Sequence, residues 1–434
     1  MIGRIVVIND LSTAKGGASL LAVESARQFA ARGYRVTLLC GDRGNPLLAA
    51  DGIEMVALGQ ERLLDGNPLT TALRGIWNHA AKAMVAGWIA ANDTPDTVYH
   101  VHGWSQILSP ALFAALAPVG GRVVMTAHDF FLTCPNGAMF DYRAAAPCPL
   151  TPMSGACVTR DCDRRGRAFK LWRVARQAVQ ERQLRASGRP PQLLIHADMA
   201  PFFNRSGLGE GDMAALPNPV VAYADHRIAA ERNRDVLYVG RIEETKGVDL
   251  AAAACRMTGV RLVAAGDGAQ LPALRHEYPE MEWAGRQDRA GIARLAATAR
   301  MLVMPSRYME PFGLVAVEAL WSGLPVLACE HSLLAGDIVA AGAGLAIDPR
   351  DTRAFAAAIA RLRDDDRLTR AMSESAFAHT RHLALTPDRW IDALLDAYAA
   401  LLAGGRGALF AASDRWAGKS DQPSLQEPAP CASM

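Results

Sequence analysis

Two cations lie on one short loop in the second half of the chain, where a strand-like run ends and a helix-like run begins. The strand-like run ends at Val239-Gly240-Arg241, and Lys246-Gly247 follows shortly after it. Only five of the 46 basic residues are lysines, so a lysine at this place is less easily explained as a random surface charge. Two cations and the free amides of a helix N-terminus suit a pyrophosphate. The alternative is a pair of solvated surface charges.

Two carboxylates frame a second segment, residues 310–318, with the sequence EPFGLVAVE. Pro311 is suited to the first turn of a helix, and Gly313 lets the backbone approach a ligand closely. We expect the free amides of that turn to face a phosphate or a sugar. Glu318 then lies about two turns along, at ~5.4 Å a turn, so Glu310 and Glu318 could hold two parts of one elongated ligand. Two ordinary helix glutamates are the alternative.

Histidines and glycines follow strand-like runs in the first half. His128-Asp129 comes directly after one run, and His100 and His102 lie near the end of another, His102 being the better candidate for a cleft. Such strand ends face the crevice of an α/β fold, although each histidine could instead be buried and satisfied. Gly16-Gly17 lets amides approach an anion or simply makes a tight turn. It lacks the GxGxxG spacing, which argues against a simple NAD enzyme.

The remaining sequence supplies elements that can bring these strand ends together. Short β-branched runs alternate with alanine-rich helical stretches, which is typical of βαβ units in a parallel sheet. The chain has 434 residues, enough for two domains, and the proline-flanked Asn218 marks the crossing between them. We therefore predict an α/β protein of two Rossmann-like, doubly wound domains facing a central cleft. The predicted strands are residues 4–9, 35–40, 53–58, 97–102, 122–127, 235–239, 261–265, 301–304, 325–328 and 344–347, and the helices of the first half include 18–32, 69–92, 105–116 and 169–186.

Together these motifs resemble those of the retaining glycosyltransferases of family 4, which have the fold known as GT-B. The resemblance spans roughly residues 4–402, and its motifs occur in the family's order. One departure is Asn218-Pro219, where the family usually has Asn-Gly. The matching motifs are GGAS at 16–19, HDFF at 128–131, VGR at 239–241 with Lys246-Gly247, AGDG at 265–268, and the 310–318 run followed by GLPV at 323–326.

The resemblance implies roles for the matching residues. Four would act on the reacting groups: Arg241 and Lys246 on the donor diphosphate, Glu310 on the donor sugar, and His128 on the sugar near the reacting carbon. Glu318 would hold the ribose hydroxyls of the nucleotide. The other expected donor-binding residues act through their backbone or by close approach, and they are Gly17, Gly240, Phe312, Gly313 and Leu314.

The activity implied is transfer of a sugar from a nucleotide-diphosphate sugar to a glycan or glycolipid-type acceptor, with retention of configuration. No catalytic metal or other cofactor is expected, because the proposed front-face displacement needs mainly positioning and charge stabilisation. The Asp-x-Asp pairs at 161–163 and 364–366 follow no predicted strand and are interpreted as solvated charges. The alternatives are a nucleotide-sugar epimerase or hydrolase of the same fold, and a catalytically silent binding protein.

The implied domains are an acceptor domain at residues 1–217, a donor domain at 218–386, and a helix at 387–402 that packs back onto the first domain. Residues 403–434 are expected to be a disordered tail. We expect neither a signal peptide nor a transmembrane segment, and therefore a cytoplasmic enzyme of polysaccharide biosynthesis. A lipid-linked acceptor and peripheral membrane contact stay open. The net charge of +2 gives no reason to expect a nucleic-acid partner.

Four of the eight cysteines, Cys134, Cys148, Cys157 and Cys162, lie in a Pro- and Gly-rich stretch at about residues 128–165. We name this stretch the cysteine segment. It is longer than the ~12–15 residues usual for a loop, so it is either functional or locally folded. Its spacings lack a CxxC pair. They leave open a structural zinc site, another bound metal, and free buried thiols in a reducing compartment.

Overall fold

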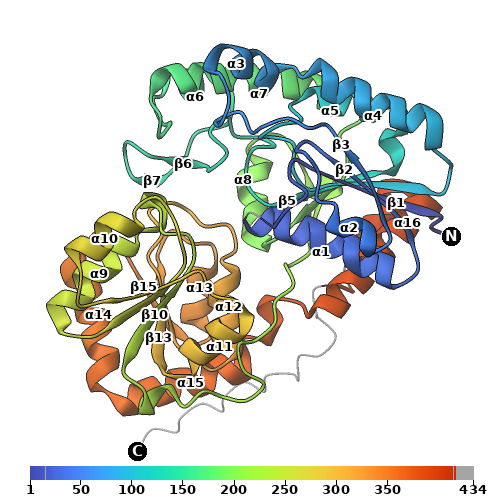
Figure 1. Cartoon of the computed structure of the whole chain (residues 1–434). Helices are drawn as coiled ribbons and strands as arrows, with labels where there is room; N and C mark the ends of the chain where they lie inside the picture. Colours follow the sequence, from blue (N-terminus) through green and yellow to red (C-terminus); the bar gives the residue numbers. More distant parts are fainter. Residues whose placement is uncertain (15, 414, 417–434) are drawn as a thin grey trace, which may run out of the picture.

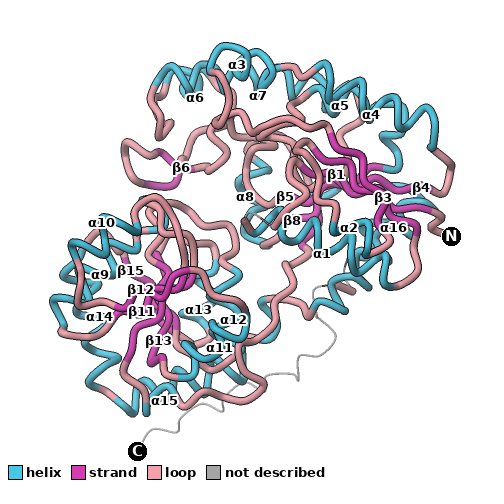
Figure 2. The backbone as a smooth tube through the Cα atoms, in the orientation of Figure 1, coloured by secondary structure: helices cyan, strands magenta, loops and turns pink. Residues whose placement is uncertain are grey.

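The computed structural model describes residues 1–14, 16–413, 415 and 416, and these form two α/β domains that face each other (Figure 1). Each domain is built on its own parallel sheet, with helices on both faces (Figure 2). The predicted fold class is therefore confirmed: the protein consists of two Rossmann-like, doubly wound domains.

The N-terminal sheet has the order β3-β2-β1-β4-β5-β8-β9 within the described residues. Its central strands are continuous apolar runs, as expected of strands buried on both faces. The strand order reverses between β1 and β4, which places the carboxyl ends of β1, β4 and β5 at the cleft. The strands are β1 (Arg4–Asn9), β2 (Arg35–Cys40), β3 (Ile53–Ala57), β4 (Thr97–Val101), β5 (Val123–Ala127), β8 (Gln192–Leu194) and β9 (Met213–Ala215).

The helices of the N-terminal domain begin and end where local capping allows. Asn78 accepts a hydrogen bond from the amide of Ala81 at 3.2 Å and begins α4, so the single helix predicted at 69–92 is two helices. The helix predicted at 105–116 starts only at Ala111, because the amides of residues 106–108 instead bind the Asp10 carboxylate. The helices are α1 (Gly17–Ala31), α2 (Leu47–Ala50), α3 (Pro68–Ile76), α4 (His79–Asn92), α5 (Ala111–Leu116), α7 (Arg167–Ala186) and α8 (Ala200–Asn204).

The C-terminal sheet has the order β12-β11-β10-β13-β14-β15 within the described part of the chain, so it reverses between β10 and β13. Its strands are β10 (Asp235–Val239), β11 (Leu262–Ala265), β12 (Glu282–Gly285), β13 (Ala299–Met304), β14 (Val326–Cys329) and β15 (Gly344–Ile347). Its helices are α9 (Val248–Thr258), α10 (Leu271–Glu277), α11 (Arg289–Ala297), α12 (Leu314–Trp321), α13 (Leu334–Ala340), α14 (Thr352–Asp364) and α15 (Asp366–His379).

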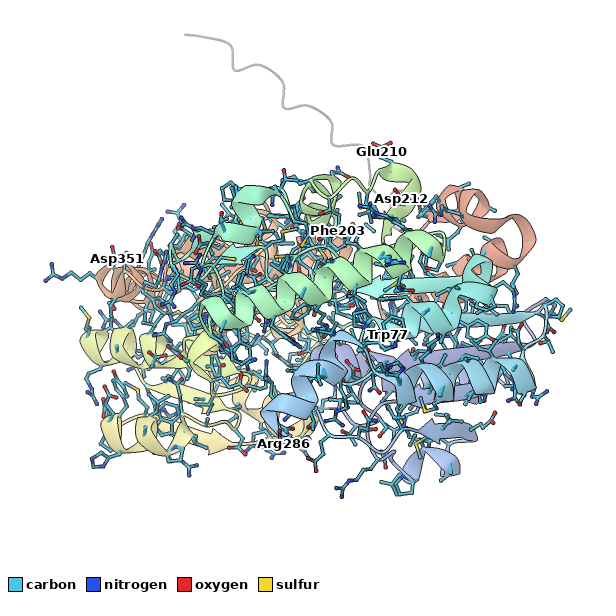
Figure 3. The ribbon with its side chains drawn as sticks, turned by 90° about the horizontal axis from the view of Figure 1, so that it is seen from above. Trp77, Phe203, Glu210, Asp212, Arg286 and Asp351 are labelled. Atoms are coloured by element: carbon cyan, nitrogen blue, oxygen red, sulfur yellow. The ribbon has the colours of Figure 1, made fainter. Side chains whose placement is uncertain are left out.

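The cysteine segment is locally folded and reaches toward the C-terminal domain. It contains a short hairpin of β6 (Phe140–Asp141) and β7 (Ala146–Pro147), and then α6 (Gly155–Thr159). The hairpin lies between the two domains (Figure 1). At its tip the carbonyl of Ala145 accepts a hydrogen bond from Arg350 at 2.7 Å, and the ring of Phe140 lies 6.0 Å from that of His331. Seen from above, the long helix α7 crosses this face of the N-terminal domain with α3 beside it (Figure 3).

Two stretches of chain cross between the domains side by side. The amide of Val220, just after Asn218-Pro219, donates to the carbonyl of Leu385 at 2.9 Å. The chain then enters α16 (Pro387–Ser413), which lies against the N-terminal domain (Figure 1). Its apolar face is buried there, with the Tyr398 ring 5.6 Å from that of Phe29 in α1.

The expectation of a disordered tail from residue 403 is wrong for its first part. The helix breaks at Gly404-Gly405 but continues to Ser413, and Leu409, Ala412 and Trp416 are buried. Residues 417–434 lie outside the described residues. Among the described helices, α16 alone is long and apolar enough to cross a membrane, by length and composition only.

Candidate active site

A buried ion pair lies at the carboxyl ends of β10 and β13. Lys246 ends a short 3₁₀ turn (Glu244–Lys246) after β10, and its Nζ is 2.6 Å from Oε1 of Glu310 and 3.0 Å from the Tyr308 hydroxyl. Gly247 must be glycine, because its φ is 68° and an added Cβ would lie 2.0 Å from the carbonyl oxygen of Pro305. This close backbone approach brings the lysine loop onto the loop that carries Glu310.

The pair is charged despite its burial. Burial alone would raise the pKa of Glu310, but Lys246 and the Ser306 hydroxyl, which donates to Oε2 at 2.5 Å, lower it below its usual value. Burial likewise disfavours the ammonium of Lys246, but Glu310 and Tyr308 together raise its pKa above the usual value. The side chains keep 19% and 14% of their surface exposed, so both groups remain reachable from the cleft.

Arg241 stands near this pair and is less constrained. Its side chain is 60% exposed, and its guanidinium bonds Glu243 at 2.9 Å. It contributes to the lowered pKa of Glu310, so it lies within electrostatic reach of the pair. The structure thus brings Lys246 and Glu310 into contact and leaves Arg241 beside them, free to turn toward a ligand.

The first turn of α12 begins later than the sequence suggested. The helix starts at Leu314, so Pro311 and Glu310 precede it, and only Glu318 lies on it. Gly313 has φ 84°, and an added Cβ would lie 2.7 Å from the sulfur of Met304, so the chain can turn here only as glycine. Phe312 is 3% exposed, which leaves only its backbone for a ligand.

Gly17 of the opposite domain approaches this turn. An added Cβ at Gly17 would lie 3.5 Å from Cδ1 of Leu314. The first turn of α1 therefore faces the first turn of α12 across the cleft, and Gly240 directly follows β10. Two helix N-termini and a lysine facing one space favour a ligand rich in negative charge.

Glu318 lies apart from the Lys246–Glu310 pair, on α12. Its carboxylate lies 4.0 Å from Arg289 and beside the Tyr223 hydroxyl, with 21% of the side chain exposed. Burial raises the pKa of Glu318 to about 7, and Arg289 and Tyr223 oppose this rise only in part. Glu318 can therefore exist as carboxylic acid or carboxylate near neutral pH.

Three histidines stand in a row behind the cleft. His128, half-buried at the end of β5, has its Nε2 2.9 Å from Nδ1 of His102. His102 is 3% exposed and lies beside His100, with ring centroids 4.0 Å apart and the rings tilted by 39°. His100 is bonded at both ring nitrogens, by Tyr398 at 2.6 Å and Thr126 at 2.8 Å. His100 is thus a satisfied core histidine, and the expectation that His102 faces the cleft is wrong, since it lies buried behind His128.

The contacts among the three histidines determine which ring nitrogen of His128 carries the proton. Burial lowers the pKa of His100 to about 3, of His128 to about 4, and of His102 well below its usual value, so all three rings are neutral and carry one N–H each. Nε2 of His102 is buried with no partner in the described structure. Because an orphaned buried N–H is rarer than an orphaned acceptor, we place the proton of His102 on Nδ1, donating to His128. His128 then carries its own proton on Nδ1 and presents a donor to the cleft.

Sequence reasoning missed several supporting groups. Tyr308 and Ser306 contact the lysine–glutamate pair, and the proximity of both to Glu310 in the sequence was the only available signal. Arg176 on α7 is 6% exposed with two unpartnered nitrogens, and it lies near Asp129, whose pKa burial raises to about 6. Because Arg176 is one of several basic residues in this helix, the sequence did not indicate that it is buried near Asp129.

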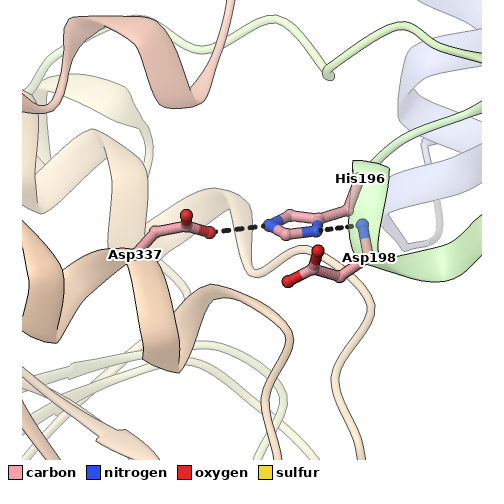
Figure 4. Close-up of side chains that lie close together, drawn as sticks. All are labelled: His196, Asp198 and Asp337. Atoms are coloured by element: carbon pink, nitrogen blue, oxygen red, sulfur yellow. Dashed lines mark hydrogen bonds and ion pairs between the residues drawn. The ribbon is translucent and has the colours of Figure 1, made fainter.

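One group of possible metal ligands occurs among the described residues, formed by His196, Asp198 and Asp337 (Figure 4). The amide of Asp198 donates to Nδ1 of His196 at 3.1 Å, so the imidazole proton lies on Nε2, which donates to Asp337 at 3.0 Å. A metal on Nε2 would require the proton on Nδ1, where that amide already points. We therefore interpret the group as a hydrogen bond between the two domains.

The structural zinc considered for Cys134, Cys148, Cys157 and Cys162 is not supported. In the described part of the chain, no three of these sulfurs come close enough together to share an ion. All seven cysteines that the structure describes are buried free thiols. The side chain of Lys170 contacts two of the four sulfurs, those of Cys157 and Cys162.

Comparisons with known proteins agree with this arrangement. Residues 15–178 match the family described as Glycosyltransferase Family 4, and residues 224–379 match Glycosyl transferases group 1. The chain is 34% identical to a glycogen synthase of Mycobacterium tuberculosis over 37% of its own length, and it spans only 42% of that relative. It is 28% identical to D-inositol 3-phosphate glycosyltransferase 1 of Catenulispora acidiphila, over 90% of this chain and 92% of the relative.

Solved structures share the fold along nearly the whole chain. A sucrose-phosphate synthase from Thermosynechococcus elongatus aligns with a TM-score of 0.66 at 18% identity, covering 92% of this chain and 99% of the other. The Anabaena protein HepE, solved with UDP-glucose, aligns with a TM-score of 0.61 at 16% identity and covers 92% and 99%. Two Rossmann-like domains facing a shared cleft define the GT-B class. The chain belongs to glycosyltransferase family 4.

Proposed function

We propose that this protein transfers a glycosyl group from a nucleotide-diphosphate sugar to a hydroxyl of a glycan or glycolipid-type acceptor, with retention of configuration. The observation that carries the proposal is the largely buried Lys246–Glu310 pair, which lies in the domain whose helix α12 meets Gly17 at the start of α1 across the cleft. The named activities of the relatives, a glycogen synthase and an inositol phosphate glycosyltransferase, support the reaction class. The UDP-glucose bound to HepE makes UDP-sugars the first donors to test.

The geometry suggests how each group contributes. Lys246 and the amides at the start of α12 would hold the donor diphosphate, while Glu310, anchored by Ser306, would accept a hydroxyl of the donor sugar. Negative charge grows on the diphosphate as the glycosidic bond breaks, so fixed cations and amides stabilise the transition state more than the bound donor. The leaving diphosphate oxygen would accept the acceptor's proton, which requires no protein base.

The acceptor would enter beside the hairpin of the cysteine segment. A pocket of about 180 Å³ lies there between the domains, lined by Tyr142 and Arg164 of the N-terminal domain and by Thr245 and Arg307 of the C-terminal domain. Thr245 directly precedes Lys246, so this pocket adjoins the site proposed for the diphosphate. We further propose that the enzyme works in the cytoplasm in polysaccharide biosynthesis, where its free thiols stay reduced.

Donor turnover should not require a divalent metal, because Lys246, Arg241 and helix amides supply the positive charge. We expect nucleotide release from UDP-, GDP- or ADP-sugars to be little changed in excess EDTA. Chromatography of the nucleotide product measures this, and NMR of the anomeric proton tests retention. Loss of activity in EDTA with recovery on adding magnesium or manganese would contradict metal independence. An epimerised donor, donor hydrolysis even with acceptors present, or stabilisation by donor without turnover would favour the alternative functions instead.

Donor affinity should depend on pH through Glu318. If its carboxylate accepts the ribose hydroxyls, only the ionised form binds well, and its pKa is about 7. The donor KM should therefore be constant above pH 8 and rise as the pH falls through 7, by at most about tenfold per pH unit. Initial rates measured from about pH 5.5 to about pH 9 give the donor KM on both sides of this pKa.

The matched variant is Glu318→Gln, which cannot ionise. It should show a raised donor KM that no longer changes across this range, while kcat changes little. A Glu318→Gln enzyme that keeps the wild-type pH profile of KM would show that another group titrates.

A further inference from the structure

Lys170 is buried among thiols in the cysteine segment. It lies on α7, is 1% exposed, and its Nζ is 3.3 Å from the sulfur of Cys162 and 3.5 Å from that of Cys157. These two sulfurs are its hydrogen-bond partners in the described structure. The sequence has only five lysines, and the proposed transfer reaction uses neither this one nor the cysteines around it.

A buried ammonium is costly unless an anion pairs with it. The sulfurs of Cys157 and Cys162 are the groups that favour the charge on Lys170, and they raise its pKa above the usual value although burial lowers it. Burial also raises the pKa of the Cys162 thiol above its usual value, and Lys170 opposes that rise only in part. We favour the ion pair, because the pKa of Lys170 is raised above its usual value and its Nζ lies only 3.3 Å from the sulfur of Cys162.

The sulfur of Cys162 has two hydrogen-bond donors beside it, whereas Lys170 is the donor to the sulfur of Cys157 within the described residues. The sulfur of Cys162 faces both Lys170 and the side-chain amide of Asn136, whose Nδ2 is 3.4 Å away. Cys134 differs, since its sulfur donates to Oδ1 of Asn136 at 3.1 Å and burial raises its pKa to about 11. Cys134 therefore stays a thiol, while Cys162 and Cys157 share one cation.

We propose that Cys162, Cys157 and Lys170 form a redox-active dithiol site, in which hydrogen peroxide converts the two cysteines into a disulfide. The Cys162 thiolate attacks the peroxide, so an S–O bond forms and the O–O bond breaks. The departing hydroxide takes a proton from Lys170 and leaves as water. The Cys157 sulfur then attacks the sulfenic sulfur, an S–S bond forms, and the sulfenic oxygen leaves as a second water with the Cys157 proton. Two electrons pass from the sulfurs to the peroxide.

The site is connected to the contact between the domains. The carbonyl of Cys162 accepts hydrogen bonds from the amide of Tyr142 and from the Asn136 side chain, each at 3.3 Å. These residues flank the first strand of the hairpin whose tip bonds Arg350. A shift of Cys162 on oxidation therefore reaches the hairpin that spans the cleft.

The test is oxidation of the folded full-length protein by hydrogen peroxide in a Cys431→Ser background, which removes the one cysteine outside the described residues. Intact mass should fall by two hydrogens, and peptide mapping should find Cys157 joined to Cys162, reversibly with dithiothreitol. Cys157→Ser and Cys162→Ser should each abolish the product. Cys255→Ser, a matched buried thiol far from any lysine contact, should leave it unchanged.

The role of Lys170 is tested by rate. Lys170→Met should slow disulfide formation roughly tenfold or more, because a neighbouring cation shifts a thiol pKa by about one unit or more. Lys170→Arg keeps the charge and should oxidise within a few-fold of wild type, with far-UV circular dichroism confirming that both variants fold. The proposal is overturned if folded protein forms no Cys157–Cys162 disulfide, or forms a link from Lys170 to sulfur instead. It is also overturned if Lys170→Met forms the disulfide at the wild-type rate. None of these results depends on transfer activity.

Discussion

Lys246→Ala should lower kcat/KM for the donor by roughly ten- to several-hundred-fold. The substitution removes a charge-assisted contact worth about 1.5–3 kcal/mol, and it does so where the diphosphate gains charge in the transition state. It also frees Glu310, which Lys246 holds at 2.6 Å, from its present position. The loss should therefore appear in kcat as well as in KM, measured by initial rates of nucleotide release.

The stability of the variant must be measured beside its kinetics. Removing one partner of a buried pair leaves a buried carboxylate uncompensated, which costs up to about 3–5 kcal/mol. Thermal unfolding identifies any loss of folded protein, and Lys82→Ala serves as a control at an exposed lysine on α4. Arg241→Ala should cost less than Lys246→Ala, because Arg241 is exposed and already bonds Glu243. Wild-type kcat and KM in Lys246→Ala would remove the main physical support for the proposed function.

The long strands of both sheets could be predicted from the sequence because they are continuous apolar runs. The predicted strand at 4–9 and the one at 235–239 coincide with β1 and β10. The short strands β8, β9 and β12 were missed, because three or four residues carry no periodic pattern. The tail was misjudged for a related reason. Its glycines and polar residues suggested disorder, whereas Leu409 and Trp416 are buried by tertiary packing that local composition does not report.

The residues of the candidate site could be proposed from the sequence, but their contacts could not. The sequence placed Lys246 and Glu310 at two strand ends and gave them separate partners on a ligand. The structure shows that they pair with each other, since β10 and β13 are neighbours in the sheet. The same limit applies to His102, which alternation along a strand could not assign to one side. It also applies to Lys170, whose thiol neighbours come from the cysteine segment, where the sequence predicted no helix or strand.

His128→Ala should lower kcat/KM by roughly ten- to a hundredfold, if its Nδ1–H donates to the donor sugar near the reacting carbon. Such a loss corresponds to about 1–3 kcal/mol, the cost of leaving a partly buried polar group unpaired. His226→Ala, at a histidine whose side chain is 78% exposed, is the control and should leave the rate unchanged. A His128→Ala enzyme with unaltered kcat/KM would place His128 outside the donor site.

His102→Leu should reproduce part of that loss, about two- to tenfold, although it lies behind His128 and contacts no ligand. Without the donor 2.9 Å away, His128 is free to put its proton on Nε2 and offer the cleft a lone pair in place of a hydrogen. His102→Asn keeps an N–H near the position of Nδ1 and should restore most of the activity.

Nitrogen NMR of labelled histidines reports the tautomer directly, so it separates a proton-directing role from simple packing. Wild-type protein with the His128 proton on Nε2 would contradict the argument whatever the kinetics show. A His102→Leu variant that keeps the Nδ1 proton on His128 and full activity would show that the ring position alone fixes the tautomer.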